Sequence, residues 1–153
     1  MITTTLQQLR TRLQSISSPA LTKVYADPSE AGDIGAFPCA ILSLDPAQQH
    51  QWRMAAHGLA RHSYWIVIWI FVGARAATPL HELHSRCLVW PQPIAVALYS
   101  GITLGNNVEW VGAGETDQLF SYTIGAIEWA GKDLFGLTIS LPVTEKIPTA
   151  MDA

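Results

Sequence analysis

The sequence predicts an α+β fold: a mostly antiparallel β-sheet with two to three helices packed on one face. Apolar residues recur at helical spacing near the start of the chain and again in its middle. The last third instead alternates apolar and polar residues, which is typical of strands. Residues 130–133 read as a hairpin turn between two of these strands, so we expect the two strands to be antiparallel.

The first predicted element is a helix that ends at Ser17-Ser18-Pro19. Its apolar positions lie three or four residues apart and make one stripe: Leu6, Leu9, Leu13 and Ile16. Strands are expected at 23–25 and 37–44. Residues 27–35, between these strands, read as a polar loop. Its acidic residues are Asp27, Glu30 and Asp33.

Residues 46–63 are expected to form either a long connection or a protruding hairpin. The segment is locally basic, because no acidic residue occurs between Asp45 and Glu82. Its large apolar and basic side chains are Trp52, Arg53, Met54 and Arg61. Connections this long inside a small domain are usually functional or disordered.

Residues 62–74 are expected to be the central strand of the sheet. The apolar run at 64–72 is far shorter than the roughly 20 residues of a membrane helix, and its β-branched and aromatic residues favour a buried strand. A second helix is expected to start at Thr78-Pro79, because proline is favoured in the first turn. Its predicted buried face is Leu80, Leu83, Cys87, Leu88 and Trp90. Pro91 and Pro93 are expected to end or kink it, before a short apolar segment at 94–99.

The last third is expected to hold strands at 107–111, 119–129 and 135–143. The third of these has the clearest two-residue alternation in the chain. The remaining residues are polar and include Pro148, so they read as a frayed end. We therefore predict a single domain at 1–144 and a flexible C-terminal tail at 145–153.

Charge is scarce in this chain. Charged residues make up 14% of the sequence, against about 25% in an ordinary soluble domain. Glu109 is the one charged residue between 88 and 114, and the chain contains six tryptophans. A bare, tryptophan-rich surface favours a symmetric homo-oligomer over the alternative of a monomer with a rich core. The net charge of −3 argues against broad nucleic-acid binding.

No motif in the sequence predicts catalysis. His81, His84 and Cys87 are metal-type residues, but Cys87 lies roughly 240° around a helix from His81, so the three cannot bind one ion from an ideal helix. We therefore expect no catalytic residue, no metal and no cofactor. Cys39 and Cys87 are expected to be free thiols, and the N-terminus does not read as a signal peptide.

Several of these segments together resemble a known family. The N-terminal leucine stripe leads to the aromatic-proline strand start Phe37-Pro38-Cys39-Ala40-Ile41, and the most similar stretches are 122–131 and 137–143. In this layout the chain resembles the tail terminator proteins of long-tailed bacteriophages, also called tail completion or minor tail proteins of the lambda U type.

The resemblance implies a structural virion protein rather than an enzyme. Such proteins form a hexameric ring that caps a finished tail tube, stops tube polymerisation and presents a docking face to the neck or head-completion protein. DNA passes through the ring without sequence-specific binding. The implied place is the head-proximal end of the tail in the virion, after assembly in the host cytoplasm and without contact to a membrane.

Candidate partner-contact residues come from the two charged segments. They are Trp52, Arg53, Met54 and Arg61 in the basic segment, and Asp27, Glu30 and Asp33 in the acidic loop. If the two segments lie on opposite sides of a subunit, their charges are expected to steer pairing between copies. The remaining alternatives are another head–tail connector or adaptor, a tail tube protein, a non-viral binding module, and an oligomeric metal enzyme built around His81, His84 and Cys87.

Overall fold

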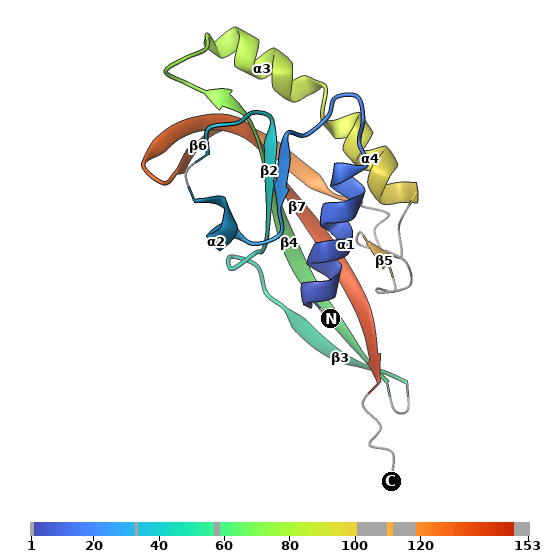
Figure 1. The fold of residues 1–153 in the computed structure, drawn as a ribbon. Helices are drawn as coiled ribbons and strands as arrows, with labels where there is room; N and C mark the ends of the chain where they lie inside the picture. Colours follow the sequence, from blue (N-terminus) through green and yellow to red (C-terminus); the bar gives the residue numbers. More distant parts are fainter. Residues whose placement is uncertain (1, 33, 57–58, 101–109, 112–118, 149–153) are drawn as a thin grey trace.

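The computed structural model describes residues 2–32, 34–56, 59–100, 110–111 and 119–148 (Figure 1). Its elements in chain order are α1 (Ile2–Gln14), β1 (Lys23–Tyr25), α2 (Pro28–Ala31), β2 (Cys39–Leu44), β3 (Gln51–Ala56), β4 (Leu59–Ala74), α3 (Leu80–Leu88), α4 (Pro91–Ser100), β5 (Trp110–Val111), β6 (Ser121–Trp129) and β7 (Lys132–Pro148). The predicted α+β class is confirmed, because helices and strands do not alternate and most strand pairs are antiparallel.

The described strands form one seven-stranded sheet around two long antiparallel neighbours, β4 and β7. Along the free edge of β4, β3 pairs with its first part and β2 with its later part. On the outer edge of β7, β6 pairs with its first part and β5 with two residues further along. β1 extends the sheet beyond β2 and runs parallel to it. Over the residues that the structure describes, the sheet therefore has a wide body and a narrower end formed by β3, β4 and β7.

Three helices cover one face of this sheet, as predicted. Figure 1 shows α1 and α4 crossing in front of the long strands, with α3 leading into α4. Alternate residues of β4 and β7 point at these helices and make the main core. Its fully buried members include Leu9, Leu13, Ile66, Ile68, Leu83, Ile94, Leu137 and Ile139. The expected leucine stripe of the first helix is thus confirmed as a core contact.

The opposite face of the sheet carries a smaller core under α2. Ala31 and Ile34 pack there against Cys39, Ile41 and Phe71. The acidic segment expected to be a loop therefore contains a short helix. Proline at its first position and a capping aspartate before it suit a helix start.

The helical region after β4 differs from the prediction. Leu83, Cys87 and Trp90 are buried as expected, but Leu80 and Leu88 are exposed, so that part of the predicted buried face is wrong. Pro91 begins a further helix, because a first-turn proline lacks only an N–H that would be unpaired anyway. The apolar segment at 94–99 consequently lies inside α4.

The C-terminal boundary also lies further along than predicted. β7 continues to Pro148 and stays paired with the first residues of β4. Glu145 is only 1% exposed, although its polar character suggested a tail. Residues 145–148 therefore belong to the sheet, while 149–153 lie outside the described residues. Of the strand expected at 107–111, only Trp110 and Val111 are described, and they form β5.

Candidate functional site

A three-stranded arm extends from the body of the sheet. It consists of β3, residues 59–63 of β4 and residues 144–148 of β7, and it reaches beyond the helices in Figure 1. The prediction of a protruding hairpin in 46–63 is thus confirmed over the described residues. The arm places its side chains on two faces, because consecutive strand residues point in opposite directions.

One face of the arm is apolar and exposed. Trp52 and Met54 are neighbours on this face, 59% and 92% exposed. The Trp52 indole stacks on the His62 imidazole with ring centroids 4.2 Å apart and planes within 7°. Burial lowers the pKa of His62, while the nearby carboxylate of Glu145 opposes that shift. Stacking on a mostly buried ring fixes the Trp52 side chain without removing it from solvent.

The other face of the arm is basic. Arg53 on β3 stands directly opposite Arg61 on β4, and Arg61 stands opposite Lys146 on β7. The Arg53 guanidinium donates to the Oε1 of Gln51, two residues earlier on the same strand, at 2.8 Å. Like charges directly opposite in a sheet are mutually destabilising. By register, basic residues of neighbouring strands therefore gather on the face of the arm opposite Trp52 and Met54.

A buried polar cluster holds the base of the arm against α1. The hydroxyls of Tyr64 and Thr5 donate to Glu145 Oε1 at 2.7 and 2.8 Å, and the two hydroxyl oxygens are 2.8 Å apart. Burial raises the pKa of Tyr64 above its usual value, so the phenol stays neutral. The three residues come from α1, β4 and β7. The cluster therefore fixes the direction of the arm relative to the helices.

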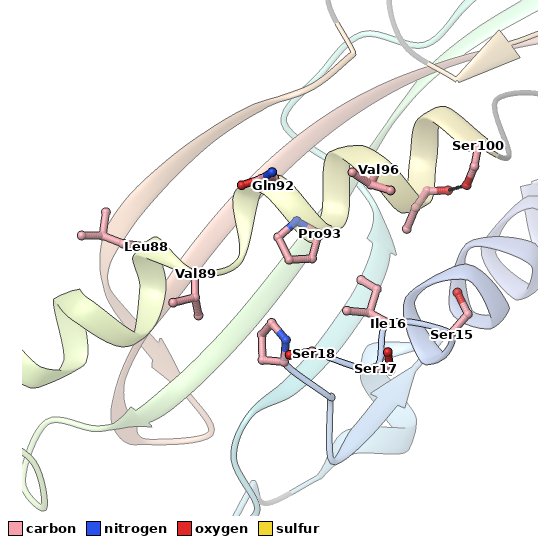
Figure 2. Close-up of a pocket in the computed structure, with 12 residues that line it drawn as sticks. Ser15, Ile16, Ser17, Ser18, Leu88, Val89, Gln92, Pro93, Val96 and Ser100 are labelled. Carbon is pink, nitrogen blue, oxygen red and sulfur yellow. Dashed lines mark hydrogen bonds between the residues drawn. The ribbon is translucent and has the colours of Figure 1, made fainter.

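An open apolar groove lies at the other end of α1. Figure 2 shows it between residues 15–19, which follow α1, and the α3–α4 region. Its volume is about 890 Å³. The lining residues are Ser15, Ile16, Ser17, Ser18, Pro19, Leu88, Val89, Gln92, Pro93, Val96, Ala97 and Ser100. None of them is charged, and Leu88, Val89 and Val96 are more than half exposed. An exposed apolar surface of this kind marks a contact site.

The acidic segment is separate from the arm within one chain. The Asp27 carboxylate accepts from the Ser29 N–H at 2.9 Å, which lowers the Asp27 pKa, and Glu30 is exposed. Asp33 lies outside the described residues. Tyr25 is level with Trp69, so the segment lies on the order of 20 Å from Arg61 along the strands.

By register, Arg53 and Arg61 lie on the face of the sheet where α2 packs. α2 packs on the face to which Phe71 contributes, and Arg61 shares that face, because it lies ten positions before Phe71 on β4 and alternate residues of a strand share a face. At this separation Asp27 and Glu30 do not pair with Arg61 of the same chain.

The residues considered for a metal site do not converge. His81 and His84 are exposed, whereas Cys87 is buried in the main core. Burial raises the pKa of the Cys87 and Cys39 thiols to about 11, so both are poor nucleophiles at neutral pH. Within the described ranges, no three histidine, cysteine or acidic side chains gather as a metal site would require.

No family model matches the chain, and no curated protein matches it. Among the helices described, none has the length and apolar character needed to cross a membrane. Function is therefore inferred from the arm, the groove and the charged segments.

Sequence reasoning found the arm residues but missed the groove. The sequence predicts Leu88 to be buried, but it is exposed in the groove, and no local pattern singles out Val89 or Val96 as contact residues. The available signal was the absence of charge in the 88–100 segment, which predicts a covered helix but does not say what covers it. The position of the groove depends on where residues 15–19 pass α4, and this contact is distant in sequence.

Proposed function

We propose that this protein is a structural virion subunit that closes into a ring by head-to-tail contact with copies of itself. The observation that carries this proposal is the pair of different exposed apolar surfaces at the two ends of α1, the arm face and the groove. A contact between two different surfaces is heterologous, and heterologous contacts build closed rings when the rotation between neighbours closes.

In this proposal the ring is the hexameric tail terminator that the sequence resemblance implies. It caps the tail tube at the head-proximal end of the virion tail, ends tube polymerisation and offers its second flat face to the neck or head-completion protein. Scarce charge supports the assignment, because such a subunit gives its sides to neighbours and its flat faces to other layers. The net charge of −3 fits a lumen through which DNA slides without being held.

The proposal is tested by tube length. A tail tube protein of a long-tailed bacteriophage is polymerised with and without this protein, and tube lengths are measured by electron microscopy. We expect shorter tubes with added ring density at one end, because a capped end no longer adds tube subunits. Unchanged lengths with bare ends contradict the tail terminator assignment. Rings that form but bind only a head connector favour the connector alternative instead.

A further inference from the structure

We propose that the apolar face of the arm, carrying Trp52 and Met54, docks in the groove of a second copy. The inference rests on the proposed ring and names the two surfaces that build it. Tryptophan is a frequent anchor residue at protein interfaces, and methionine adapts to irregular apolar surfaces. The groove is uncharged and about 890 Å³ in volume, so it can receive both side chains without burying an unpaired charge.

The arm cannot reach the groove of its own chain. Its strands β3, β4 and β7 are paired with one another, and the Thr5–Tyr64–Glu145 cluster fixes its base near the start of α1. The groove begins at Ser15, ten residues after Thr5 along the helix axis, which is roughly 15 Å away. The two surfaces face outward at opposite ends of α1, so only another copy can bring them together.

Polar groups in the groove suit the same occupant. The Trp52 indole N–H needs an acceptor once it leaves water, because an unpaired buried donor is costly. The Gln92 amide and the hydroxyls of Ser17 and Ser18 line the groove and supply acceptors. A purely aliphatic ligand would leave these groups without partners. The mixed lining therefore favours an occupant with an apolar body and a single polar tip.

The arm's apolar face and the groove lie on the same side of the sheet. Trp52 stands opposite His62 and Met54 opposite Ala60, and these alternate residues of β4 share the face on which α1 and α4 pack. The groove is formed on that side by residues 15–19 and the α3–α4 region. An arm that continues the plane of the next subunit's sheet therefore brings apolar surface to apolar surface.

The test uses one charge-bearing variant of each surface. Met54→Glu alters only the arm face, and Val96→Glu only the groove; both side chains are largely exposed, so folding is expected to persist. Each variant alone loses one half of every contact, and we expect assembly to weaken by at least about 100-fold because a carboxylate would be buried without a partner. Tyr122→Glu, at an exposed aromatic residue of β6 outside both surfaces, is the matched control and should assemble like the wild type.

Mixing the two variants identifies the contact. Val96→Glu subunits keep an intact arm and Met54→Glu subunits keep an intact groove, so an equimolar mixture has one intact contact and is expected to form 1:1 heterodimers and nothing larger in native mass spectrometry.

If the wild type forms rings only on tube ends, each variant alone should fail to form them there while Tyr122→Glu succeeds. Rings from either variant alone overturn the arm-in-groove contact but leave the proposed function standing. A wild type that forms no ring in solution or on tubes overturns both.

Discussion

Gly136→Ala is expected to destabilise the protein by about 4 kcal/mol or more. Gly136 pairs with Phe71 at the point where β4 and β7 shift register, beside the bulge between Phe71 and Gly73. A Cβ atom at this position would overlap the carbonyl group of Ile70 and press on the Cα of Phe71. Backbone atoms in a paired strand cannot move aside as a flexible side chain can. The central strand pair would have to separate locally, and we expect low yield of folded protein and a large loss in urea-unfolding free energy.

The matched control for this substitution is Gly125→Ala. Gly125 lies directly opposite Gly136 on β6, but nothing lies within 4 Å of a Cβ built on it. Alanine there should be neutral or stabilise slightly, by up to roughly 1 kcal/mol, since it restricts the unfolded chain. Circular dichroism during urea unfolding measures both variants. If the unfolding free energy of Gly136→Ala is within about 1 kcal/mol of the wild-type value, the strand pair is not packed as described.

Trp90→Ala is expected to cost about 3–5 kcal/mol of stability and to abolish assembly. Trp90 is 2% exposed, belongs to the main core and joins α3 to α4: its N–H donates to the Cys87 carbonyl, and its carbonyl accepts from the Ile94 N–H. Loss of the indole leaves a large cavity under the helix that forms one wall of the groove. The surface that receives the arm is therefore lost together with the packing.

Trp52→Ala separates these two effects. Trp52 is exposed and contacts His62 by stacking, so its removal should change the unfolding free energy by less than about 1 kcal/mol. Assembly should nevertheless fail, because Trp52 is the proposed anchor in the groove. Unfolding is best measured in the Met54→Glu background, where assembly does not contribute to stability. Equal losses of stability in the two tryptophan variants would contradict the burial difference on which this comparison depends.

Much of the fold follows from local sequence patterns. The alternation at 135–143 predicts β7, and the leucine stripe predicts α1, because each pattern directly reflects which side of an element is buried. Two features did not follow. Pro91 and Pro93 read as helix breakers, yet both lie in the first turn of α4. Glu145 reads as part of a tail, yet pairing with β4, more than eighty residues earlier, continues the strand and buries it.

The candidate site was predictable only in part. Trp52, Arg53, Met54 and Arg61 could be singled out because large apolar and basic residues share a segment without acids. Their division between two faces could not be inferred until the β3–β4 register was known. The groove was out of reach for a similar reason, since it joins residues 15–19 to a helix more than seventy positions later.

The central claim is that this chain assembles with itself, head to tail, into a closed ring. Native mass spectrometry of the purified protein, free and bound to tail tube ends, tests it most directly. We predict one discrete species of six copies, either in both samples or on the tube ends alone. Single copies that persist at high concentration and leave tube ends bare would contradict it.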